Sequence, residues 1–266
     1  MSKLRRERIA EMRDELPFGK FIPSGLTIVG LCCGATAIRF SLSDQWKAAV
    51  VAIVCAAIFD MLDGRAARLF GADSKFGAQL DSLADLVSFG IAPSVLVYMW
   101  TLYHANGAGW ALSLIFCVCC AIRLARFNIE SDVETEDGEE EVESGAHFTG
   151  VPTPAAACLI LLPMLLSFQF SDPIFRDPIM TGAMVALVSF LMVSRLRTVS
   201  FKKLRVPRHM KAPLMMFVGL LLTSAVIWPW ATLTTGLIVY LATLPLGAVP
   251  MEELKRRRIR LRRPPL

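Results

Sequence analysis

Long apolar stretches alternate with short polar connections along the whole chain. Each stretch holds about twenty residues, the length that a helix needs to cross the hydrocarbon core of a membrane. The pattern therefore predicts an all-α, polytopic membrane helix bundle that forms a single domain over residues 1–266. We expect about eight spans, near residues 22–40, 47–66, 86–104, 109–127, 154–170, 178–195, 212–229 and 231–250.

The composition supports this interpretation. Hydrophobic residues make up 55% of the 266 residues, and the mean hydropathy is +0.53. A chain of this length with one ordinary soluble core contains fewer apolar residues, so the excess has to be buried in a membrane. The composition thus argues against a soluble globular protein.

Lysine and arginine gather in three places: the first 20 residues, residues 195–211 and the tail at 251–266. Short loops rich in these residues tend to remain cytoplasmic, so we expect both termini and the even-numbered connections on the cytoplasmic side. The net charge of +5 fits contact with anionic membrane lipids better than nucleic acid. Residues 3–17 are predicted to be either a short interfacial helix or a disordered basic leader.

A dense acidic motif lies where the second predicted span turns into the third. It reads Asp60-x-x-Asp63-Gly64-x-x-Ala67-Arg68, then eight residues, then Gly77-x-x-x-Asp81-x-x-x-Asp85. At about 100° per residue, the first two aspartates lie within about 60° of each other on a helix, and the last two within about 40°. Two helices joined by the loop at 71–76 can therefore direct four carboxylates into one pocket.

Four ionised carboxylates at the mouth of a membrane bundle need compensation, because each costs several kcal/mol if it is left unpaired. A divalent cation, or a pair of them, meets this need. Oxygen ligands favour Mg²⁺ or Mn²⁺, and these ions commonly bind substrate phosphates, so the motif indicates a pyrophosphate substrate. Gly64, Gly77 and Ala67 would let a nucleotide approach the backbone, and Arg68 can hold a phosphate oxygen.

The motif resembles the signature of the CDP-alcohol phosphotransferase family at every fixed position. The resemblance implies a cytoplasm-facing site in a core of six transmembrane helices, often within a homodimer, and it places this core at 21–205 with two additional spans at 206–250. It also implies that Asp60, Asp63 and Asp81 bind metal, two ions in all, together with Asp85, which would act as the general base. By the same resemblance, CDP would contact Asp60, Gly64, Ala67, Arg68 and Gly77.

Other stretches look like the phosphatidylserine synthase branch of that family. They are residues 88–93, 123–128, 148–154, 192–194 and 200–202. The resemblance implies transfer of a phosphatidyl group from CDP-diacylglycerol to L-serine. Family members often carry Pro-Asn-x-x-Thr at the start of the first span, where this chain has Pro23-Ser24-Gly25-Leu26-Thr27.

Serine carries a carboxylate that needs a cation in a site of low dielectric constant. Arg123 and Arg126, near Asn128, can bind that carboxylate or a lipid phosphate, or they can simply anchor a helix end at the headgroups. Choline, glycerol phosphate and inositol remain alternative acceptors. A cation transporter is a further alternative, but it predicts acidic residues at mid-membrane and repeated halves. For an enzyme of this kind we expect the bacterial inner membrane, with the active site facing the cytoplasm.

Overall fold

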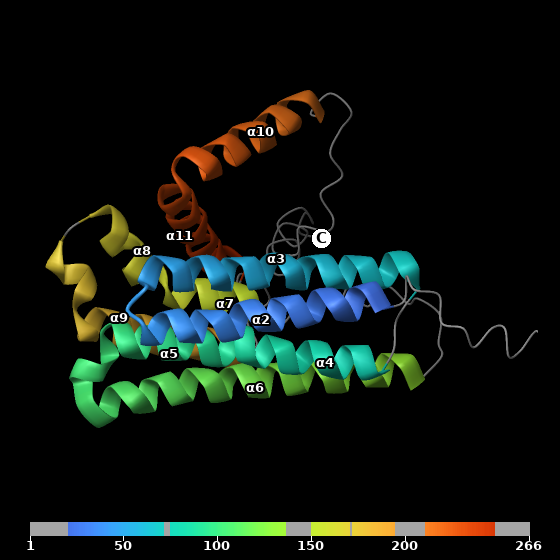
Figure 1. Cartoon of the computed structure of the whole chain (residues 1–266), viewed down its shortest axis with the longest axis horizontal. Coiled ribbons are helices and arrows are strands. Elements are labelled where there is room, and N and C mark those ends of the chain that lie inside the picture. Colours follow the sequence, from blue (N-terminus) through green and yellow to red (C-terminus); the bar gives the residue numbers. More distant parts are fainter. Residues whose placement is uncertain (1–20, 72–74, 137–149, 171, 195–210, 248–266) are drawn as a thin grey trace, which may run out of the picture. The chain divides into compact units, whose positions relative to one another are not determined.

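The computed structural model describes residues 21–71, 75–136, 150–170, 172–194 and 211–247. Every regular element in these ranges is a helix (Figure 1). Within these ranges, three helical segments are long and apolar enough to cross a membrane by length and composition, and three shorter apolar helices accompany them. The predicted all-α class is confirmed, whereas the number of about eight spans stays a prediction. The interfacial helix predicted at 3–17 lies outside the described residues.

The chain divides into two compact units, residues 1–100 and 101–266. The first contains α2 (Ile22–Leu42), α3 (Trp46–Phe70), α4 (Lys75–Asp85), the π-helix η2 (Leu86–Ile91) and α5 (Ala92–Trp100). The last three elements follow one another without a break. Helix α2 runs beside α3 (Figure 1) and also packs against α4, η2 and α5. Helix α2 therefore contacts every other described helix of this unit.

Small residues allow α2 and α3 to approach each other closely. A Cβ atom added to Gly30 on α2 would lie 3.5 Å from the Cβ of Phe59 and 3.7 Å from the Ala56 carbonyl oxygen. Close backbone contact of this kind is how helices associate in membranes. Helix α3 ends at Gly71, whose left-handed φ of 56° is a conformation that glycine adopts without strain.

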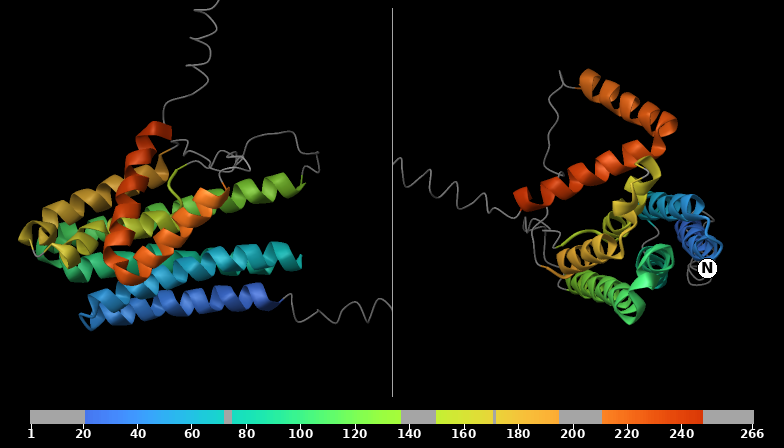
Figure 2. Two further views of the ribbon diagram at one scale, coloured as in Figure 1. Left: turned by 90° about the horizontal axis from the view of Figure 1, so that it is seen from above. Right: turned by 90° about the vertical axis from the view of Figure 1, so that its left-hand side faces the viewer.

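The second unit contains η3 (Leu102–Ala105), α6 (Asn106–Glu136), α7 (Thr153–Ile160), α8 (Leu162–Gln169), η4 (Pro173–Arg176), α9 (Pro178–Val193), α10 (Lys211–Ile227) and α11 (Pro229–Gly247). Helix α9 packs against α6 and α7, as Figure 2 shows, and α11 packs against α8. Helix α10 contacts α11 and exposes most of its apolar side chains.

The third and fifth predicted spans show two kinds of difference from the structure. The third was expected at 86–104, but its helical rod begins at Lys75 and ends at Trp100. The fifth, expected as one helix over 154–170, is divided at Leu161 into α7 and α8. Proline explains this division, because Pro163 has no backbone N–H to donate and its ring clashes with the preceding turn of a continuous helix.

Candidate active site

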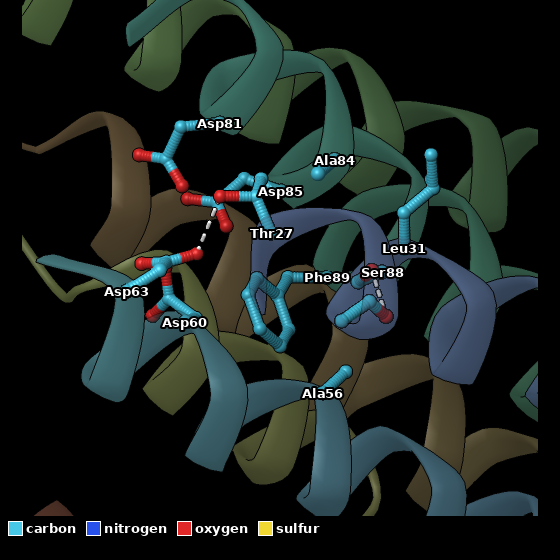
Figure 3. A pocket seen from close by; sticks show the side chains of 11 residues that line it. Thr27, Leu31, Ala56, Asp60, Asp63, Asp81, Ala84, Asp85, Ser88 and Phe89 are labelled. Atoms are coloured by element: carbon cyan, nitrogen blue, oxygen red, sulfur yellow. Dashed lines mark hydrogen bonds between the residues drawn. The ribbon is translucent and has the colours of Figure 1, made fainter. Parts of the chain in front are cut away.

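The four aspartates of the motif line one pocket in the first unit. Asp60 and Asp63 belong to α3, whereas Asp81 and Asp85 belong to α4. Figure 3 shows the two pairs approaching the same space from their two helices. Helix α2 contributes Thr27 to the wall. We call this group the carboxylate pocket, and it is the convergence that the helical spacing predicted.

Three carboxylates of the pocket are close enough to share one ion. Asp60, Asp63 and Asp81 each offer an oxygen atom, and these atoms all lie within 4.8 Å of one another. Two oxygens bound to the same ion at about 2.0–2.6 Å can be up to about 4–5 Å apart. The spacing and the all-oxygen chemistry therefore fit a hard divalent cation.

The fourth carboxyl group, that of Asp85, is a hydrogen-bond partner of the Asp60 side chain. Two ionised carboxylates this close repel each other unless a proton or a cation lies between them. The contact thus shows that Asp85 lies within the same charged group as the three possible ligands.

Thr27 supports Asp63 from α2. Its hydroxyl oxygen lies 2.8 Å from Asp63 Oδ2 and 3.1 Å from the Pro23 carbonyl oxygen, and the Asp63 side chain is only 5% exposed. A hydrogen bond to one carboxylate oxygen fixes the orientation of the other. Sequence reasoning missed this role, although Thr27 closes the Pro23-Ser24-Gly25-Leu26-Thr27 stretch that departs from the Pro-Asn-x-x-Thr pattern of the family.

A close contact between α2 and η2 lies immediately beyond Asp85. The Ser88 hydroxyl donates a hydrogen bond to the Gly30 carbonyl oxygen at 3.3 Å. A Cβ added to Gly34 would lie 2.7 Å from the Ser88 Cα atom, so no larger residue fits there without movement. Segments of π-helix occur frequently at functional sites. This one begins at the residue after Asp85, so its contact with α2 restrains the backbone next to that residue.

The other motif residues lie on the same helices but do not line the pocket. Gly64 and Arg68 are exposed, whereas Ala67 and Gly77 are half-buried. Arg68 Nε donates to the Gly64 carbonyl oxygen at 3.1 Å. A Cβ on Gly64 would meet no heavy atom of the described residues within 4 Å. The backbone there is open to a ligand.

Three more predicted site residues lie on α6 in the second unit. Arg123 Nη1 donates to Thr153 Oγ1 at 3.0 Å, and Arg126 Nη1 donates to the Val193 carbonyl oxygen at 3.4 Å. Arg126 is exposed and Asn128 is half-buried. Arg123 therefore contacts a side-chain hydroxyl, whereas Arg126 contacts the end of α9.

Comparison with known proteins shows which family the sequence of this chain matches. Residues 20–189 match the family model described as CDP-alcohol phosphatidyltransferase. Three similar bacterial proteins are each named CDP-diacylglycerol–serine O-phosphatidyltransferase. The Mycobacterium leprae (strain TN) protein is 35% identical over 226 residues, covering 85% of this chain and 74% of the relative. The Helicobacter pylori (strain ATCC 700392 / 26695) protein is 37% identical over 183 residues, covering 69% and 73%. The Bacillus subtilis (strain 168) protein is 37% identical over 185 residues, covering 69% and 92%.

Proposed function

This chain belongs to the CDP-alcohol phosphatidyltransferase family, and we propose that it transfers the phosphatidyl group of CDP-diacylglycerol to L-serine, giving phosphatidylserine and CMP. The observation that carries the proposal is the carboxylate pocket, in which four acidic side chains from α3 and α4 converge. Acidic side chains grouped in this way suit divalent ions, which in turn bind the diphosphate of a substrate. The names of the relatives support serine as the acceptor.

The pocket would hold Mg²⁺ or Mn²⁺, in one or two ions, through Asp60, Asp63 and Asp81, with Asp85 as a further ligand. Divalent ions held there would neutralise the charge of the diphosphate and of the departing CMP. Thr27 holds Asp63 in a fixed orientation through its hydroxyl. This ligand is thereby oriented before the substrate arrives. Groups oriented in advance can stabilise the charge of the transition state without rearranging during the reaction.

CDP would bind along the open edge of the motif. We propose contacts with Asp60, Gly64, Ala67, Arg68 and Gly77. The space above Gly64 supports this assignment, since a nucleotide can approach the backbone where no side chain intervenes. The Arg68 guanidinium donates to the Gly64 carbonyl oxygen through Nε, which leaves its other N–H groups to bind a phosphate oxygen.

Asp85 is proposed to act as the general base. The serine hydroxyl oxygen attacks the phosphorus atom that carries diacylglycerol, and Asp85 takes the hydroxyl proton as the new bond forms. The bond from this phosphorus to the bridging oxygen of the diphosphate breaks, and CMP leaves with the electron pair. The contact of η2 with α2 holds Asp85 in place, as a catalytic carboxyl group requires.

The apolar helices support a membrane location for this reaction. We propose about eight spans, of which six form the catalytic core, in the inner membrane of a bacterium. The cytoplasmic active site, the cytoplasmic termini and a homodimeric assembly belong to the same proposal. Arg123, Arg126 and Asn128 would bind the acceptor or a lipid phosphate.

The test uses the purified full-length protein in detergent micelles that contain CDP-diacylglycerol. L-serine, choline, glycerol phosphate and inositol are supplied in turn with Mn²⁺, and CMP release is measured. We expect release with serine alone, loss of activity on chelation with EDTA, and recovery on addition of Mg²⁺ or Mn²⁺. Release that depends on another alcohol would overturn the acceptor, and full activity after chelation would overturn the metal requirement.

A further inference from the structure

The hydroxyl group of Tyr240 on α11 is buried inside the second unit. Its oxygen atom is shielded from solvent and has no hydrogen-bond partner among the described residues. A buried phenol usually finds a partner, because the hydroxyl group loses its hydrogen bonds to water when it is buried. The position therefore suits a ligand that accepts a hydrogen bond from Tyr240.

One cationic side chain, that of Arg123, acts on this hydroxyl group. The Arg123 guanidinium interacts electrostatically with Tyr240, and Arg123 Nη1 also donates to Thr153 Oγ1 at 3.0 Å. The Thr153 side chain is 3% exposed, and a hydroxyl group that accepts a hydrogen bond still has its own proton to donate. Arg123, Thr153 and Tyr240, from α6, α7 and α11, form what we call the arginine cluster.

Polar contacts fix α11 along its own axis. Gln169 Nε2 donates to Thr234 Oγ1 at 2.6 Å and to the Trp230 carbonyl oxygen at 3.2 Å. The Phe168 and Trp230 rings pack edge to face, with centroids 5.1 Å apart. Tyr240 lies six residues after Thr234, about 9 Å further along the helix. Packing against α8 therefore fixes the part of α11 from which Tyr240 extends.

We propose that the arginine cluster binds an oxyanion, either a carboxylate or a phosphate group, and that Tyr240 donates a hydrogen bond to it. A guanidinium group and hydroxyl groups bind such anions through charge-assisted hydrogen bonds. Tyr240 and α11 lie beyond residues 20–189, which match the family model. The C-terminal pair of helices thus takes part in substrate recognition, an assignment that rests on the proposed function. The anion is the serine carboxylate or the phosphate of a lipid substrate.

The test compares Tyr240→Phe with Tyr103→Phe in the full-length enzyme. Each variant loses one hydroxyl group, and Tyr103 is an exposed control. If the anion is the serine carboxylate, we expect Tyr240→Phe to raise the KM for serine about tenfold, with kcat within about twofold and an unchanged Tm. If the anion is the lipid phosphate, the KM for CDP-diacylglycerol rises instead. Unchanged values of both KM would overturn the proposal, as would a lower Tm without any change in KM.

A binding measurement separates this proposal from the transferase activity. The Tm of wild type and Tyr240→Phe is measured with L-serine or sodium phosphate added and CDP-diacylglycerol omitted. A ligand that binds the folded protein raises its Tm, so one probe should stabilise wild type more than the variant. Thr153→Val, which loses a hydroxyl group at similar volume, should also reduce the stabilisation. Equal stabilisation of all three proteins, or of none, overturns the site, whereas absence of CMP release from wild type overturns the proposed function instead.

Discussion

The carboxylate pocket and the arginine cluster are opposite in charge, and they lie in different units of the chain. Four aspartates line the pocket, and neither lysine nor arginine is among the described residues of its wall. The arginine cluster joins a guanidinium group to two hydroxyl groups. Charged groups in a medium of low dielectric constant are stabilised by charges of opposite sign. The first region therefore suits a cation, and the second suits an anion.

This difference separates two tasks that an enzyme of this family has to perform. Groups that contact the reacting atoms or the metal chiefly affect kcat, whereas groups that hold a distant part of a substrate chiefly affect KM. Substitutions in the carboxylate pocket should therefore reduce turnover or metal affinity, and substitutions in the arginine cluster should weaken substrate binding. The following variants test this division in order of decreasing effect.

The largest effect is expected for Asp85→Asn. The amide cannot accept the serine proton, so kcat should fall about 10³-fold, within the range for loss of a general base. Binding of CDP-diacylglycerol, measured at equilibrium, should remain. Asp177→Asn is the matched control, because Asp177 caps α9 by accepting a hydrogen bond from the Ile179 N–H group and asparagine caps helices equally well. Normal turnover by Asp85→Asn would contradict its role as the base.

Alanine substitutions at two glycines separate a role in helix packing from a role in ligand access. Gly34→Ala forces the new methyl group against Ser88 on η2, so kcat should fall by about tenfold or more as Asp85 is displaced, and Tm should fall by several degrees. Gly64→Ala meets open space in the described structure, so its Tm should stay unchanged while the KM for CDP-diacylglycerol rises. Equal Tm losses in the two variants would show that Gly64 also has a packing role.

The smallest effect is expected for Thr27→Val, which keeps the side-chain shape and loses the hydrogen bond to Asp63. Partners of metal ligands typically change metal affinity by about 10–100-fold when they are removed. We expect the Mn²⁺ concentration for half-maximal activity to rise by about tenfold, with kcat at saturating Mn²⁺ nearly unchanged. Thr36→Val on the same helix is the control, because that hydroxyl group donates to a carbonyl oxygen of its own helix. The same Mn²⁺ dependence in wild type and Thr27→Val would refute the role of Thr27.

The sequence alone predicted the features that depend on local periodicity. Apolar stretches gave the helical class, and the spacing of Asp60, Asp63, Asp81 and Asp85 gave their convergence, because helical geometry fixes which side chains share a face. The division at Leu161 also had a local signal in Pro163, which the apolar pattern concealed. The proposed roles of the four aspartates in binding and catalysis stay predictions.

Features that depend on contacts between distant segments could not be predicted. Thr27 lies 36 residues from Asp63, and nothing in a single sequence indicates which hydroxyl group will meet which carboxylate. The π-helix after Asp85 arises where η2 packs against Gly30 and Gly34, and it leaves no trace in the hydrophobic pattern. Tyr240 reads as an ordinary aromatic residue of an apolar helix until α11 is placed beside its neighbours.

The π-helix has one further consequence for the rod formed by α4, η2 and α5. A π-turn is equivalent to one residue inserted into an α-helix, and each residue turns the helix by about 100°. The insertion therefore sets the angular offset between the aspartates before it and the packing residues after it, such as Ser88 and Phe89. Because the rod is continuous, a change in packing at Ser88 also turns the aspartates, and a substitution far from the reacting atoms can reach the catalytic carboxyl group.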